Sequence, residues 1–178
     1  MQPGIEVFIG AGSNISPHIN MPAALRMLTA SGTLAEGTSV EVSSHYVTQA
    51  LNKPADPCFV NGVWRIRTRL SASQIKEVLH KIEADLGRKR GTDPYAPREI
   101  NLDILLYGEA ISAENGIPDP DICKRNFIFI PLLELCPDII IPGKPEPLRS
   151  RVDTDRSGMV LSPITDTLKA IALEVGSA

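Results

Sequence analysis

The chain has 178 residues, of which 43% are hydrophobic and 22% charged, with a formal net charge of −3. This composition predicts a single globular domain over residues 1–178, and the charge gives no reason to expect nucleic acid or a membrane as a partner. Three cysteines without CxxC spacing predict reduced thiols, and the apolar runs are too short to span a bilayer. The first residues have no basic, apolar signal-peptide pattern, so we expect a cytoplasmic protein.

The first third of the chain alternates between strand and helix signals. Residues 5–12 form an apolar run that ends in glycine, which predicts a buried strand. Residues 13–32 predict a loop and a helix that Gly32 closes, and the β-branched residues of 38–48 predict a second strand. Prolines and aspartate then mark residues 49–57 as a loop.

The middle of the chain carries the strongest local signals. Residues 58–70 alternate between apolar and polar side chains and predict a half-buried strand. Residues 71–86 predict an amphipathic helix, because Ser71 and Gln74 match a capping box and Gly87 follows as a natural stop.

A further strand signal, APREINLDILLYG, occupies residues 96–108 and carries Asn101 and Asp103 two positions apart. This spacing places both side chains on one face of a strand. Two carboxylates presented in this way would form an oxygen-rich site for Mg²⁺, but here one of the two is an amide.

The loop before this strand is basic, with four cations within eleven residues: Arg88, Lys89, Arg90 and Arg98. Such a loop is most often a solvated surface. Beside metal ligands, however, it suits phosphoryl transfer, in which a metal and arginines neutralise phosphate oxygens. The chain has no GxxxxGK[ST] motif, which argues against a P-loop enzyme.

The last third gives weaker signals. Residues 117–127 are rich in proline, residues 128–137 form a short apolar segment, and a helical pattern returns near 163–175. Several strands have one apolar face, which favours an α+β fold with helices packed on an antiparallel or mixed sheet.

Four segments together resemble the 6-hydroxymethyl-7,8-dihydropterin pyrophosphokinase family of folate biosynthesis. They are IGAGSNIS near the start, VSSHYVTQAL, CFVNGV and, most specifically, GRKRGTDPYAPREINLDILLYG. The resemblance extends from about residue 5 to 142, whereas residues 143–178 match poorly. It implies a ferredoxin-like core in an α/β/α sandwich, and transfer of pyrophosphate from ATP to the hydroxymethyl oxygen of the pterin, with release of AMP.

The resemblance also assigns site residues. Two Mg²⁺ ions are expected at Asn101 and Asp103, where the family has two aspartates, and Arg88, Arg98 and Asp103 are the expected catalytic residues. The expected ATP contacts are His80, Glu83, Arg88, Arg90, Arg98, Ile104 and Arg125. The expected pterin contacts are Thr48, Leu51, Phe59, Asn61, Tyr95 and Phe127. Without the resemblance, Phe59 and Phe127 would be interpreted as core residues and Asn61 as a polar residue at a strand edge.

The departures from the family concentrate on the nucleotide side. Asn101 replaces an aspartate, and Asp119 stands where the family usually has a histidine. Three hypotheses follow: a working enzyme in which a carboxylate such as Asp119 supplies the missing charge, a relative that binds a pterin without transfer, or a scaffold without a ligand. The joint presence of Arg88, Arg98, Asp103 and the pterin residues argues against the scaffold. The partners expected are small molecules, and the expected state is a monomer or a homodimer.

Overall fold

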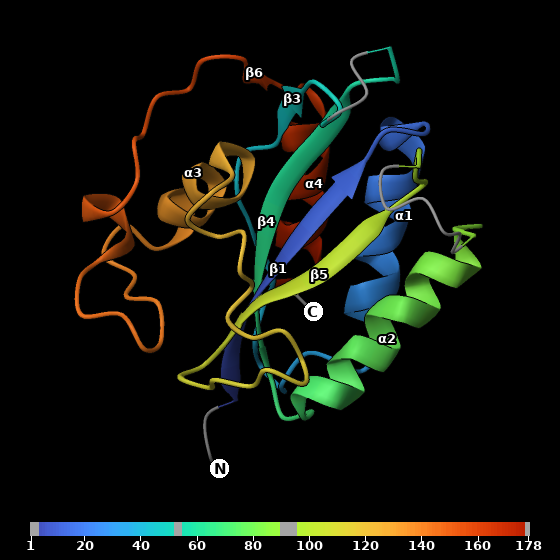
Figure 1. Cartoon of the computed structure of the whole chain (residues 1–178). Helices are drawn as coiled ribbons and strands as arrows, with labels where there is room; N and C mark the ends of the chain where they lie inside the picture. The colour runs from blue at the N-terminus through green and yellow to red at the C-terminus, as the bar shows by residue number, and fades with distance from the viewer. Residues whose placement is uncertain (1–3, 52–54, 90–95, 177–178) are drawn as a thin grey trace.

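The structure is a computed structural model that describes residues 4–51, 55–89 and 96–176 (Figure 1). Its strands are β1 (Ile5–Ser13), β2 (Glu41–Val42), β3 (Tyr46–Thr48), β4 (Phe59–Thr68), β5 (Asn101–Tyr107) and β6 (Val160–Leu161). Its helices are α1 (Pro17–Ala30), α2 (Ala72–Asp85), α3 (Asn126–Leu135), α4 (Ile164–Gly176) and the short 3₁₀ helix η1 (Leu148–Ser150).

The strands form one sheet in the order β5-β1-β4-β3-β6, and β2 also pairs with β4. The described pairs are antiparallel. Strand β1 lies between β4 and β5 and places Gly12 opposite Asn61 of β4 on one side and opposite Asn101 of β5 on the other. Residues separated by 40 positions in the sequence therefore lie at the same level of the sheet.

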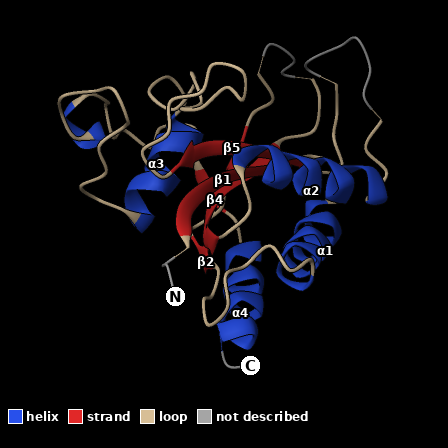
Figure 2. Ribbon diagram, turned by 90° about the horizontal axis from the view of Figure 1, so that it is seen from below, coloured by secondary structure: helices blue, strands red, loops and turns tan. Residues whose placement is uncertain are grey.

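Both faces of the sheet are covered (Figure 2). On one face α1, α2 and α4 bury a core around Trp64, Leu25, Leu79 and Leu168. On the other face α3 and the segments that follow it bury a second core with Phe8, Val63 and Leu105. This arrangement confirms the predicted α+β fold, an α/β/α sandwich with a ferredoxin-like core. Within the described ranges, no helix combines the length and apolar character needed to cross a bilayer.

The predicted capping box is confirmed. The backbone N–H of Ser71 donates to Gln74 Oε1 at 2.9 Å, and the backbone N–H of Gln74 donates to Ser71 Oγ at 3.3 Å. The prediction of one continuous strand over 38–48 is wrong, because β2 and β3 are separate. The interruption coincides with a contact to another strand: Ser43 Oγ accepts the backbone N–H of Val63 in β4 at 2.9 Å, where a regular ladder would use a carbonyl.

Three elements after residue 108 were not predicted: α3, the 3₁₀ helix η1 and β6. The apolar segment of residues 128–137 lies largely in α3, which begins at Asn126 and contains Pro131. The two-residue strand β6 extends the sheet beside β3. The C-terminal helical pattern is confirmed as α4.

Candidate active site

A cavity of about 320 Å³ lies on the face of the sheet that α3 covers. Gly10 and Gly12 of β1 contribute to its lining. A Cβ atom at Gly12 would lie 2.5 Å from Asn61 Oδ1, whereas one at Gly10 would lie 3.2 Å from the methyl carbon Cδ2 of Leu105. Glycine at position 12 therefore leaves the space that the Asn61 side chain occupies.

One side of the cavity is aromatic and carries an amide. Phe59 and Phe127 line it and are half-buried, so the interpretation of these rings as ordinary core residues does not hold. Asn61 Nδ2 donates to Thr48 Oγ1 at 2.9 Å, and this bond sets the orientation of the amide. Leu51 also lines this side, with 37% of its surface exposed. The structure therefore brings together the predicted pterin residues that it describes.

The other side of the cavity carries charge. Arg98 Nη1 donates to Asn101 Oδ1 at 2.5 Å, and Asn101 Nδ2 donates to Asp103 Oδ2. All three residues line the cavity, as does Arg125 at the start of α3. The prediction that Asn101 and Asp103 share one face of a strand is confirmed, since they stand opposite Gly12 and Gly10 of β1.

Asp119 lines the same cavity, and its carboxyl interacts electrostatically with that of Asp103. Its backbone N–H donates to the carbonyl of Leu105 at 2.9 Å, which fixes it beside β5. Burial raises the pKa of the Asp119 carboxyl, a hydrogen bond from the Asp121 amide opposes this shift, and the negative charges of Asp103 and Asp121 add to it. The carboxylates of Asp103, Asp119 and Asp121 therefore repel one another, and a bound cation would relieve this repulsion.

The chemistry of these donors fits Mg²⁺, a hard cation that binds carboxylate and amide oxygens. The carboxylates of Asp103 and Asp119 and the amide oxygen of Asn101 are the groups that could hold it. In the described part of the chain, no group of three His, Cys, Asp or Glu side chains is already close enough to hold a metal ion. Binding an ion would therefore require water ligands, phosphate oxygens or a shift of side chains.

Four predicted nucleotide residues are not among the described residues that line the cavity: His80, Glu83, Arg88 and Ile104. Glu83 is only 2% exposed; its Oε1 accepts the backbone N–H of Leu102 at 2.8 Å and pairs with Arg88. This carboxylate holds the end of α2 against β5. The Ile104 side chain packs in the core on the opposite face of the sheet.

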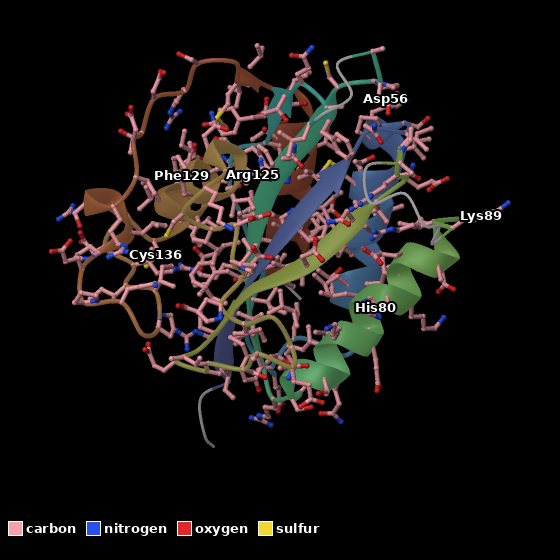
Figure 3. The ribbon with its side chains drawn as sticks, in the orientation of Figure 1. Asp56, His80, Lys89, Arg125, Phe129 and Cys136 are labelled. Carbon is pink, nitrogen blue, oxygen red and sulfur yellow. The ribbon has the colours of Figure 1, made fainter. Side chains whose placement is uncertain are left out.

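His80 lies on α2 and Arg125 at the start of α3, across the strands from each other (Figure 3). The predicted residues Arg90 and Tyr95 lie outside the described residues. Sequence reasoning missed Gly12 and Gln49, which also line the cavity. The glycine-rich end of the first strand was the signal available for Gly12, whereas nothing local distinguished Gln49.

Comparison with known proteins matches residues 8–137 to the model of the family described as 7,8-dihydro-6-hydroxymethylpterin-pyrophosphokinase (HPPK). The chain belongs to this family. It is 34% identical over 142 residues to the 2-amino-4-hydroxy-6-hydroxymethyldihydropteridine pyrophosphokinase of Haemophilus influenzae. This match covers 78% of this chain and 86% of the relative. The protein of the same name from Pseudomonas aeruginosa is 34% identical over 140 residues, covering 77% of this chain and 84% of the relative.

A third relative, the folic acid synthesis protein fol1 of Schizosaccharomyces pombe, is 35% identical over 150 residues. That match covers 82% of this chain but 20% of the relative, so the HPPK-like unit is one part of a larger protein there. The family match confirms the resemblance inferred from the sequence and identifies an enzyme family of diphosphotransferases in folate biosynthesis. The matched range ends before η1, β6 and α4.

Proposed function

We propose that this chain transfers the pyrophosphoryl group of ATP to 6-hydroxymethyl-7,8-dihydropterin, with Mg²⁺ bound. In this reaction the hydroxymethyl oxygen bonds to the β-phosphorus of ATP and loses its proton. The bond between the β-phosphorus and the oxygen bridging to the α-phosphorus breaks, and AMP leaves. The observation that carries the proposal is one cavity that joins an aromatic and amide side to a side of arginine and carboxylate.

The aromatic side suits a flat heterocycle. Phe59 and Phe127 offer ring surfaces for stacking, and Thr48 and Leu51 would close the site around the pterin. The Asn61 amide, oriented by Thr48, can both donate to and accept from the edge of a ring that carries both functions. We assign these residues to the pterin, and Tyr95 remains a predicted contact there.

The charged side suits a polyphosphate. Arg98 and Arg125 would stabilise charge on the transferred group, since guanidinium pairs well with phosphate oxygens. Bound Mg²⁺ would neutralise phosphate oxygens and polarise the group under attack. We assign Asp103 and Asn101 to the metal, although the number of ions stays a prediction.

Asp119 is the carboxylate best suited to replace the charge that Asn101 lacks. It lies in the same cavity as Asp103, and the charge of Asp103 contributes to the raised pKa of Asp119. An Asp119→Asn variant should therefore bind Mg²⁺ more weakly in the presence of ATP, as measured by calorimetry. Asp138→Asn is the matched control, because Asp138 forms an exposed pair with Arg149. Equal Mg²⁺ affinity in the two variants would remove Asp119 from the site.

The remaining nucleotide assignments are also proposals. We assign Glu83 and Arg88, at the end of α2 and the start of the basic loop, to ATP. We assign His80 and the backbone of Ile104 to the adenosine portion of ATP. Arg90 is proposed as a phosphate contact. The cytoplasmic location and the choice between monomer and homodimer stay predictions from the sequence.

A second function is supported by one observation. Arg98 already donates to the oxygen of Asn101, and the nitrogen of Asn101 faces Asp103, so the metal pair is satisfied without an ion. The alternative function is therefore that the chain binds a pterin-like ligand without pyrophosphoryl transfer. The test is an assay with ATP, Mg²⁺ and 6-hydroxymethyl-7,8-dihydropterin. Pterin-dependent AMP supports transfer, whereas a raised melting temperature with pterin and no AMP supports binding alone.

A further inference from the structure

The side chain of Asn14 joins two segments that flank the cavity. It follows β1 directly and is only 5% exposed. Its Oδ1 accepts the backbone N–H of Arg98 at 2.7 Å, and its Nδ2 donates to the carbonyl of Pro57 at 3.1 Å. Because an amide has one donor end and one acceptor end, this orientation satisfies both segments at once.

The contact with the Arg98 N–H is reinforced by bonds to the carbonyls of Arg98 and of the residue that follows it. The backbone N–H groups of Asn14 and Ile15 donate to the carbonyl of Arg98 at 3.1 and 3.2 Å. Ser13 Oγ donates to the carbonyl of Glu99 at 2.6 Å. The end of β1 therefore fixes the backbone from which the Arg98 side chain reaches Asn101 in the cavity.

The contact with Pro57 acts on the opposite side of the cavity. Two residues after Pro57, β4 begins at Phe59, which lines the aromatic side together with Asn61. Asn14 itself is not among the described residues that line the cavity. Its position suits a residue that sets the spacing between the two sides without touching a ligand.

We propose that Asn14 is a positioning residue for pyrophosphoryl transfer, because it fixes the distance between the arginine side and the aromatic side of the cavity. This inference rests on the proposed function. Transfer needs the hydroxyl oxygen and the β-phosphorus at reacting distance only when both substrates are bound. Loss of the link should therefore lower kcat more than it weakens the binding of either substrate.

The variant that tests the role is Asn14→Ala, with Asn20→Ala as its matched control. Asn20 also uses its amide to bond a backbone group, donating to the carbonyl of Ile15 at 2.7 Å, but it contacts neither cavity segment in this way. We expect Asn14→Ala to lower kcat by about tenfold or more while each KM changes by less than about threefold. Asn20→Ala should keep the wild-type kcat.

Amide hydrogen exchange gives a readout that does not depend on activity. In Asn14→Ala, the peptides that contain residues 55–60 and 96–101 should both exchange faster, while α2 and α4 keep their protection. An Asn14→Asp variant can still accept from Arg98 but cannot donate to Pro57, so it should loosen residues 55–60 more than 96–101.

The outcomes separate this inference from the proposed function. If the wild type forms no AMP, the proposed function fails, and the exchange pattern alone decides whether Asn14 links the two segments. Faster exchange in both segments supports the link. Exchange that is unchanged from the wild type, or that becomes faster throughout the protein, overturns it. If the wild type is active, an unchanged kcat in Asn14→Ala, or a loss expressed in KM alone, overturns the positioning role.

Discussion

Replacing Asn101 with aspartate adds the charge that the family resemblance predicts at this position, and it is the most informative perturbation of the site. The Asn101 amide now accepts from Arg98 and donates to Asp103. In an Asn101→Asp variant the bond to Arg98 persists as an ion pair, but the contact with Asp103 becomes a repulsion between carboxylates. Without metal, we therefore expect the variant to be no more stable than the wild type.

With Mg²⁺ bound, we expect the Asn101→Asp variant to be favoured over the wild type. One added negative charge about 4 Å from a unit positive charge gains about 4 kcal/mol at an effective dielectric constant of 20. Arg98 already neutralises part of this charge, and Asp103 competes for the same ion, so only a fraction remains. A net gain of about 1.4 to 3 kcal/mol corresponds to Mg²⁺ binding about tenfold to hundredfold tighter.

The assay is a titration of Mg²⁺ followed by calorimetry and by melting temperature, with α,β-methylene-ATP present so that no transfer occurs. The control is Asn115→Asp, which makes the same change in net charge outside the cavity, in a turn where Asn115 bonds to Ser112. Tighter Mg²⁺ binding only in Asn101→Asp supports the account. Equal affinities in both variants and the wild type would refute the reasoning that residue 101 contacts the ion.

Two further predictions test the packing around the site. Burial lowers the pKa of His45 to about 4, and because the unfolded state then binds more protons, the free energy of unfolding should fall by about 3 kcal/mol as the pH falls from 6.5 to 4. Urea unfolding at several pH values should show that the free energy of unfolding of a His45→Gln variant no longer falls in this way. The same pH dependence in the variant and the wild type would contradict the prediction. Gly12→Ala should weaken pterin binding by about tenfold, because its Cβ displaces the Asn61 amide and breaks the bond to Thr48. Gly10→Ala is the control, because the three atoms nearest to its Cβ all belong to the Leu105 side chain; equal effects of the two variants in a pterin titration would show that Asn61 is not the cause.

Much of the scaffold followed from local signals in the sequence. The capping box at Ser71 and Gln74 predicted the start of α2, and the two-residue spacing of Asn101 and Asp103 predicted their shared face. Each depends on residues that are neighbours along the chain. The division of 38–48 into β2 and β3 could not be predicted in this way, because it depends on a bond between Ser43 and Val63 of another strand.

The residues of the cavity were likewise predicted only in part. Phe59, Asn61 and Arg98 were predicted from the family resemblance and do line one cavity, but their roles stay predictions. The contacts of Asn14 with Pro57 and Arg98 could not be predicted from the sequence, since both partners are more than 40 positions away. Likewise, Glu83 was expected to contact a nucleotide, whereas its bond to the Leu102 amide depends on how α2 packs against β5.

The most direct test of the central claim follows the phosphorus atoms of ATP. The protein is incubated with Mg²⁺, 6-hydroxymethyl-7,8-dihydropterin and ATP labelled separately at the α-, β- or γ-phosphate, and the products are separated by chromatography. The account predicts that the β and γ labels appear together on the pterin and that the α label appears in AMP. Recovery of the β label in ADP, or retention of all three labels in ATP, would contradict pyrophosphoryl transfer.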